Sequence, residues 1–378
     1  MTRMPTMQKQ LGLSLVELMI ALTIGLLLLT GLSLIFVNSS EANRELQKTA
    51  QQIENGRYAI DIISQDLRMA GFYGHFHDLA AAPASLPDPC EIDTVADLQT
   101  ALALPVQGYR TADLSTRADI SATTCGGGDK ELLSDANLRP GSDVLVIRRA
   151  DTNALVRPGG VATSNEVYMQ TTGTLVEVLK GNGAAIGASN KVDGSVSTWF
   201  LNDTTTPAPI RKLHVHVYFV APCSVGSGSV TVNTVAISGI CTNSDDAVPT
   251  LKRLELISLS GNTTMRVVPL VEGIEYLKIE YGVDNSPTDV SVDTGLTGDS
   301  TVDGAYVATP GSLDDWTRVI AAKVYVLARN TEQSASFLDT KTYDLGLADV
   351  PAANDKYRRH VYTAAVRLMN VSGRRERP

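Results

Sequence analysis

One carboxylate lies inside an otherwise apolar stretch near the start of the chain. Glu17 is followed by a run from Leu18 to Ser39 that contains no charged residue. A charged side chain beside lipid costs about 2.5 kcal/mol or more, and it is usually retained where a partner compensates it. We therefore expect Glu17 to pair with a group that lies outside its own apolar stretch.

The cysteines are the next residues that could do chemistry. None belongs to a Cys-x-x-Cys pair or has a histidine at zinc-finger spacing, so disulfides are favoured over metal ligation. Nearest neighbours would pair as Cys90–Cys125 and Cys223–Cys241. Four cysteines allow three connectivities, however, and the sequence does not choose among them. Free buried thiols are the alternative.

His214 and His216 alternate along an expected strand and share one of its faces, where two imidazoles can bind a metal. No cysteine or third ligand accompanies them, so an exposed polar strand face is the favoured interpretation. The Gly-x-Ser-x-Gly, His-Glu-x-x-His and P-loop patterns are absent from the sequence. We predict that the chain is not an enzyme.

The segment from Val283 to Val307 supplies several carboxylates among serine, threonine and glycine. Such hard oxygen ligands can hold Ca²⁺ outside the cytoplasm, with Asp284, Asp289 and Asp293 as the candidate ligands. No EF-hand spacing is met, so a solvated hairpin loop is the default and calcium is the less favoured alternative. No other cofactor is indicated.

A single long helix is expected to position Glu17. A helix over Leu18 to Val37 would rise roughly 30 Å, enough to cross a bilayer core. No proline occurs between Pro5 and Pro83, so the helix should continue until Gly71 ends it. Its second half carries an apolar stripe that predicts packing onto the rest of the chain, with an isolated coiled coil as the alternative. The stripe consists of Leu46, Thr49, Ile53, Gly56, Ile60, Ile63, Leu67 and Ala70.

The remainder of the chain is predicted to be rich in strands. Residues 73–142 contain many Ala, Asp, Pro and Gly residues, which indicates a loop-rich segment with one short helix from Asp93 to Leu104. In residues 143–378 the runs with strand character are separated by loops, which favours antiparallel pairing and an α+β fold. These runs are 144–147, 167–171, 213–220, 230–237, 251–259, 274–281, 317–327 and 360–369.

The charge distribution bears on the partners and on the compartment. The 378-residue chain has a net charge of −9, which argues against a nucleic-acid binder. The first twelve residues contain Arg3 and Lys9 and no acid, so they are expected to stay in the cytoplasm. The rest of the chain would then lie across the membrane in an oxidising compartment, as the cysteines also indicate.

The stretch Gly12-Leu13-Ser14-Leu15-Val16-Glu17, with a basic leader before it and a charge-free helix after it, resembles the N-terminal signal of type IV prepilins and type II secretion pseudopilins. Two further stretches, 66–72 and 271–284, resemble the PilW-type minor pilins and, more distantly, the J-type pseudopilins. Trp316 with the strand after it, and Tyr357-Arg358-Arg359-His360, fit the same pattern.

The resemblance implies a pilin-like fold, with a long N-terminal helix packed on a large antiparallel β-rich head. It implies cleavage by prepilin peptidase between Gly12 and Leu13, methylation of the new amine on Leu13, and an assembly contact through Glu17. The expected divisions are a leader (1–12), a transmembrane and fibre-core helix (13–37), an amphipathic continuation (38–72), a loop-rich segment (73–142) and the β-rich head (143–378).

The function that the resemblance implies is that of a minor pilin. It would join other minor pilins and the major pilin in a priming complex, promote type IV pilus assembly, twitching motility and adhesion, and stay at the tip. Before assembly it would be a single-pass inner-membrane protein with a periplasmic head, served by an assembly platform. The alternatives are a minor pseudopilin of a type II secretion system and a signal-anchored periplasmic enzyme or ligand-binding protein.

Overall fold

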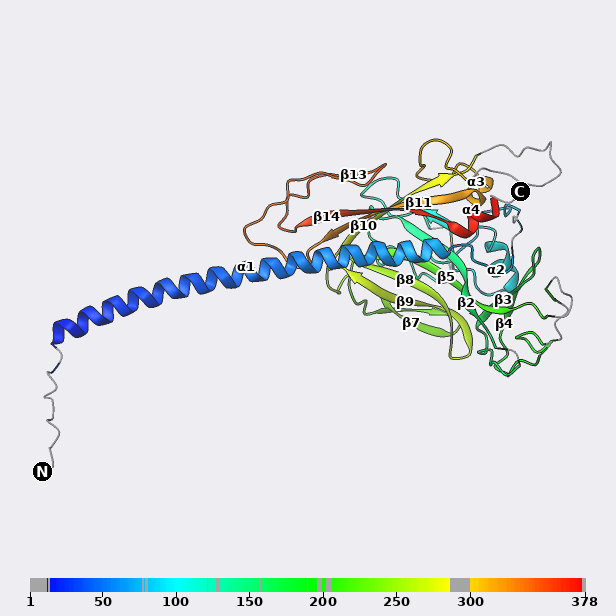
Figure 1. The fold of residues 1–378 in the computed structure, drawn as a ribbon, viewed down its shortest axis with the longest axis horizontal. Coiled ribbons are helices and arrows are strands. Elements are labelled where there is room, and N and C mark those ends of the chain that lie inside the picture. Colours follow the sequence, from blue (N-terminus) through cyan, green and yellow to red (C-terminus); the bar gives the residue numbers. More distant parts are fainter. Residues whose placement is uncertain are drawn as a thin grey trace, which may run out of the picture. The chain divides into compact units, whose positions relative to one another are not determined.

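The computed structural model describes residues 12, 14–76, 78, 81–120, 122–126, 130–156, 158–188, 190–195, 199–201, 206–285 and 300–375. It divides into two compact units, Met1–Ala50 and Gln51–Pro378 (Figure 1). The helices are α1 (Leu15–Met69), α2 (Val95–Ala101), α3 (Leu313–Thr317) and α4 (Met369–Arg375). The strands are β1 (Val106–Tyr109), β2 (Val144–Ala154), β3 (Val167–Thr171), β4 (Val176–Lys180), β5 (Ile210–Ala221), β6 (Gly228–Val232), β7 (Val235–Ile240), β8 (Thr250–Leu259), β9 (Asn262–Glu272), β10 (Ile274–Val283), β11 (Val319–Arg329), β12 (Tyr343–Asp344), β13 (Asp349–Val350) and β14 (Arg359–Arg367).

Helix α1 runs without interruption through the apolar stretch and beyond it. No proline interrupts it, and Gly71, with a φ of 71°, supplies the left-handed residue that ends it. Within the first unit the apolar side chains of α1 are exposed, and α1 is the one described helix long and apolar enough to cross a membrane. The uninterrupted helix expected from the sequence is therefore present.

The second half of α1 packs onto the strands of its own unit. Its buried residues follow a helical spacing and include Gly56, Ala59, Ile63 and Leu67. Ala59, Ile63 and Leu67 belong to a hydrophobic core shared with β10, β11 and β14. The expected stripe is partly wrong, because Leu46 and Ile53 are 67% and 39% exposed, and the buried face passes through Ala59 instead.

The head contains two antiparallel sheets of three or more strands. The larger one has seven strands in the order β1-β2-β5-β3-β4, with β8 also pairing with β5 and β9 pairing with β8. The second sheet has the order β10-β11-β14. Two-stranded pairs, β6-β7 and β12-β13, complete the described strands. The predicted α+β class, a long helix packed on antiparallel sheets, is confirmed.

Three local predictions were wrong. The single strand expected over residues 230–237 is the β6-β7 hairpin, whose turn residues Asn233 and Thr234 both have positive φ. Strand β9 was not expected, although Ser260 and Gly261 form the hairpin turn before it. The short helix begins later than Asp93, because the side chain of Thr94 accepts the capping hydrogen bond from the backbone N–H of Asp97.

Strand β5 also differs from the prediction. It was expected to be half-buried, with His214 and His216 on an exposed face. Instead it is flanked by β2 and β3 and pairs with β8, and every residue from Val215 to Ala221 is buried. A central strand covered on both faces shields the His216 imidazole from solvent, whereas His214, nearer the start of β5, is half-buried.

Candidate processing and assembly site

The residues expected to form the processing and assembly site lie at the start of α1. Gly12 is exposed, whereas Leu13 lies outside the described residues. Glu17 occupies the first turn, where its Oε2 accepts a hydrogen bond of 3.1 Å from the backbone N–H of Ser14. This is one half of a capping box, and a carboxylate in a first helical turn also interacts favourably with the helix dipole. Glu17 therefore helps to begin the helix that carries it.

A second carboxylate, Asp66, lies in the last turns of α1 and has the opposite environment. It is buried, and its oxygens accept hydrogen bonds from Arg149 Nε (2.7 Å) and the Tyr218 hydroxyl (2.9 Å), while His216 Nδ1 lies 2.6 Å away. Burial by itself raises the pKa of Asp66, but the hydrogen bond and charge of His216 and the charge of Arg149 outweigh it. The pKa therefore falls well below its ordinary value, and the ionised carboxylate ties the helix to β2 and β5.

The histidine pair is thus explained without a metal. His216 is engaged by Asp66, and His214 Nε2 lies 3.1 Å from Asp151 Oδ2. The two imidazole centroids are 5.5 Å apart and each ring has its own carboxylate partner. The prediction of an exposed polar face is wrong for His216, because the end of α1 covers that face.

Two residues from the stretches that resemble PilW-type proteins form a second buried cluster. Glu275 on β10 accepts hydrogen bonds from Arg359 Nε (2.5 Å) and from Arg139 (2.8 Å). The Arg359 guanidinium also donates to Asp339 and Asp355. Burial lowers the pKa of Arg359, but the hydrogen bonds that it donates to these carboxylates and the charge of Glu275 raise the pKa by more, so the guanidinium stays charged. The cluster joins β10 to the beginning of β14.

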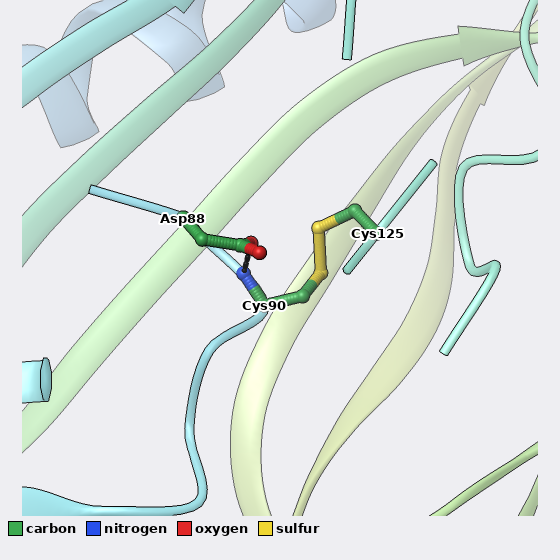
Figure 2. A group of neighbouring side chains, drawn as sticks. All are labelled: Asp88, Cys90 and Cys125. Carbon is green, nitrogen blue, oxygen red and sulfur yellow. Dashed lines mark hydrogen bonds between the residues drawn. A yellow bond between two sulfur atoms is a disulfide. The ribbon is translucent and has the colours of Figure 1, made fainter. Parts of the chain in front are cut away.

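Two disulfides are present, with the nearest-neighbour pairing: Cys90–Cys125 and Cys223–Cys241. Figure 2 shows the first, where Asp88 lies beside the two sulfurs. Both sulfurs are bonded to each other, and Asp88 accepts hydrogen bonds from the backbone N–H groups of Cys90 (2.8 Å) and Thr124 (2.5 Å). Asp88, Cys90 and Cys125 are residue types that bind metals, but here the two cysteines form a disulfide and Asp88 accepts backbone hydrogen bonds.

The second disulfide contacts a buried lysine. Lys252 Nζ lies 3.5 Å from Cys223 Sγ and 3.4 Å from Cys241 Sγ, and it donates a hydrogen bond of 3.1 Å to the carbonyl of Gly239. Burial lowers the pKa of Lys252 to about 8. The sequence contained no signal for this contact, because the lysine lies on β8, among residues that read as an ordinary strand.

Of the candidate calcium ligands, only Asp284 falls within the described residues. It is fully buried, and its Oδ2 accepts a hydrogen bond of 2.8 Å from Arg375 Nε. Asp289 and Asp293 lie outside the described residues. Asp284 thus has a cation partner from the chain itself, and a calcium site in this segment stays a prediction.

An apolar N-terminal helix that continues onto an antiparallel β-rich head is the architecture of a pilin. Residues 7–33 match the family model of the prokaryotic N-terminal methylation motif, and residues 239–370 match that of the type IV pilus-assembly protein W. The chain therefore resembles the PilW type of pilus-assembly protein over residues 239–370 and matches the methylation motif at its N-terminal end.

Two further comparisons add little to this assignment. No curated protein matches the sequence. Among solved structures, a type IV-like pilin from Thermus thermophilus aligns with 61% of this chain and 78% of its own, at 12% identity and a TM-score of 0.21.

Proposed function

We propose that this chain is a minor pilin that joins a priming or tip complex and promotes type IV pilus assembly. The observation that carries the proposal is the Gly12-to-Glu17 junction at the start of a charge-free helix, in a chain whose residues 239–370 match the pilus-assembly protein W family. The role is assembly and not catalysis. The buried carboxylates Asp66 and Glu275 each pair with arginines of the same chain, which fits a structural role.

The proposed sequence of events begins with processing. Prepilin peptidase would cut between Gly12, which is exposed, and Leu13, and the new amine on Leu13 would be methylated. Until assembly, the helix would hold the chain in the inner membrane, with the disulfide-linked head in the periplasm. The chain would then move into the pilus beside other minor pilins and the major pilin.

Glu17 would supply the assembly contact. Its Oε2 accepts the Ser14 N–H, and within the described residues its other oxygen has no hydrogen-bond partner. In a bundle of apolar helices an unpaired carboxylate is costly, and the N-terminal amine of a neighbouring subunit would neutralise it. Cleavage creates that amine, so processing and assembly are linked chemically.

A Glu17→Ala variant tests the proposal. We expect the leader to be removed normally, while the variant fails to restore surface pili and twitching motility to cells that lack the gene. Glu41→Ala is the matched control, because Glu41 is an exposed acid on the same helix beyond the apolar stretch. Normal pilus numbers with Glu17→Ala would refute the assembly role. Normal pili in the gene deletion, with a secretion defect instead, would point to a type II pseudopilin.

A further inference from the structure

The Cys223–Cys241 disulfide closes a loop that contains the β6-β7 hairpin. Cys223 comes shortly after the end of β5 and Cys241 directly follows β7, with a sequence separation of 18. Apolar side chains of the hairpin, among them Val232, Val235 and Ile237, belong to a hydrophobic core of the head. The disulfide therefore lies at the base of a hairpin that has its own packing against the head.

Lys252 lies against both sulfurs of this disulfide. Its Nζ is 3.4 Å from Cys241 Sγ and 3.5 Å from Cys223 Sγ, and it donates a hydrogen bond to the carbonyl of Gly239. Lys252 is 1% exposed, and within the described residues no carboxylate forms an ion pair with it. Because the sulfurs of a disulfide carry no charge, the ammonium is buried among neutral groups, which is costly.

Contacts other than the S–S bond hold both cysteines in place. Directly after the first cysteine, the N–H and the hydroxyl of Ser224 donate to Asp246 at 2.9 Å and 2.6 Å. Directly after the second, the N–H of Thr242 donates to Asp245 Oδ2 at 2.7 Å. The charges of these two acids also act on the Lys252 ammonium. Opening the disulfide would therefore leave both sulfurs beside the ammonium.

The other disulfide has a carboxylate in the corresponding place. An oxygen of Asp88 lies within 4.8 Å of both sulfurs of Cys90–Cys125 (Figure 2). Lys130 donates a hydrogen bond of 2.9 Å to the carbonyl of Cys90, but its charge is engaged by Asp93 at 3.1 Å. A negative charge beside a sulfur disfavours a thiolate, whereas a cation favours it. The two disulfides therefore have opposite electrostatic surroundings.

We propose that Cys223–Cys241 is a redox-responsive site of the head. A dithiol reductant opens this disulfide in preference to Cys90–Cys125, and the Lys252 ammonium then holds one of the two sulfurs as a thiolate. The thiolate supplies the counterion that Lys252 lacks in the oxidised chain. This chemistry belongs to the head and is independent of the pilus function proposed above.

The reduction consists of two thiol–disulfide exchanges. A thiolate of the dithiol attacks Cys223 Sγ, the bond between the two cysteine sulfurs breaks, and its electron pair leaves on Cys241 Sγ beside the ammonium. The second thiolate of the dithiol then attacks its own sulfur in the mixed disulfide, and Cys223 leaves and takes up a proton. The dithiol is oxidised to a disulfide, the chain gains two electrons and one proton, and the second proton goes to the solvent. Because Nζ lies beside both sulfurs, either one can be the thiolate that remains.

The expected effect of Lys252 is on the equilibrium of this exchange. Cys223 and Cys241 are each 1% exposed, so limited access slows the reaction without changing its end point. A cation beside a thiol lowers its pKa in proteins from about 8.5 to between about 3.5 and 7.5. At pH 7 a thiol pKa of about 6 makes the reduced pair about tenfold more favourable, because most of the thiol is ionised.

A redox titration of the purified full chain in detergent at pH 7 tests the proposal. The chain is equilibrated with mixtures of reduced and oxidised dithiothreitol, starting from both its oxidised and its reduced forms, and the free thiols are labelled and located by mass spectrometry. Half-reduction of Cys223–Cys241 should need a ratio of reduced to oxidised dithiothreitol about tenfold lower in the parent than in Lys252→Met. Lys323→Met, on β11 of the other sheet, is the matched control and should behave as the parent.

The first disulfide serves as an internal reference in the same samples. Cys90–Cys125 should need a higher dithiothreitol ratio than Cys223–Cys241 in the parent and should not respond to Lys252→Met. Three results would overturn the proposal: Cys90–Cys125 opening first, the same half-reduction ratio of Cys223–Cys241 in the parent and in Lys252→Met, or loss of the native circular dichroism spectrum on reduction.

The pH dependence distinguishes a thiolate held by Lys252 from a structural effect of the lysine. Dithiothreitol releases two protons and the parent takes up one, so the ratio for half-reduction should fall at least about fivefold between pH 6.5 and pH 7.5. Lys252→Met takes up two protons, so its ratio should stay nearly constant. Asp245 and Asp246, whose charges act on Lys252, are ionised over this range in both chains. A constant ratio in the parent would show that no thiolate is held.

Discussion

Gly56 is a position where the addition of one methyl group should weaken the packing of α1 against β14. It is buried on α1, and a Cβ there would lie 2.1 Å from Cε2 and 2.4 Å from Cδ2 of the Tyr362 ring. Non-bonded carbons rest about 3.5 to 4.0 Å apart, so in Gly56→Ala the ring or the helix must move by about 1.5 Å. Tyr362 lies on β14, where its neighbour Ala364 packs into the same core.

Two effects of opposite sign determine how much Gly56→Ala changes the free energy of unfolding. Alanine is a better helix former than glycine by about 1 kcal/mol. Overpacking of a filled core costs about 1–3 kcal/mol. We expect the clash to dominate, so that Gly56→Ala lowers the free energy of unfolding by about 1–2 kcal/mol. With Tyr362→Ala in the background the clash disappears, and the same substitution should stabilise the chain by up to about 1 kcal/mol.

The assay is urea unfolding of the full chain in detergent, followed by the fluorescence of the buried Trp316, whose ring centroid lies 4.8 Å from that of Tyr281. The four chains of the double-mutant cycle give a coupling energy of about 1–3 kcal/mol between the two positions. Gly25→Ala is the matched control on the same helix, because no atom lies within 4 Å of its added Cβ. A Gly56→Ala chain as stable as the parent, with no coupling to Tyr362, would refute the packing argument.

Two further predictions concern buried charges. Asp66→Asn should lower the free energy of unfolding at pH 7 by about 3 kcal/mol, whereas Asp61→Asn, an exposed change on the same helix, should alter it by less than about 0.5 kcal/mol. The folded-state pKa of Asp66 is lowered from the ordinary value of 3.8, so the ionised carboxylate contributes its full stability above pH 3.8. This contribution to the free energy of unfolding declines as the pH falls below 3.8. Urea unfolding between pH 5 and pH 2 should show the loss in the parent but not in Asp66→Asn. The folded-state pKa of Lys252 is lowered from 10.5 to about 8, so below pH 8 the buried charge lowers the free energy of unfolding. As the pH rises from 8 to 10.5 this cost disappears, and the free energy of unfolding of the parent should increase by up to about 3 kcal/mol. Lys252→Met should remove this rise and be the more stable chain at pH 7, and a parent whose stability is flat over that range would contradict the assignment.

The features predicted well from the sequence are those set by local pattern. The charge-free run after Glu17 and the absence of proline up to Pro83 were enough to predict the long helix. The nearest-neighbour disulfides were one of three connectivities that the sequence left open, and the structure has that pairing. Strand β9 was missed because Pro269 lies within it and argues against a ladder, yet this proline sits beside the register shift between Leu251 and Lys252, where it is tolerated.

The polar clusters were missed because their members are far apart in sequence. Asp66 and His216 are separated by 150 residues, and nothing local connects them. One signal was available: Asp66 lies three residues after Ile63 and one before Leu67, so it falls on the apolar side of the helix. An acid at that position requires a buried cation, and the candidates were the histidines of the expected strand 213–220 and Arg149, two residues beyond the expected strand 144–147.

Two carboxylates of α1, Glu17 and Asp66, have contrasting environments. Asp66 has partners from β2 and β5, so its charge is neutralised within the chain and can only hold the helix to the head. Glu17 has one backbone N–H from its own first turn, and that hydrogen bond leaves its net charge uncompensated. An apolar environment makes the uncompensated charge costly, and in the assembly proposed above the amine of another processed subunit would remove that cost. On that proposal, the Asp66 contact lies within the subunit and is complete before assembly, whereas the Glu17 contact with a neighbouring subunit would form only during assembly.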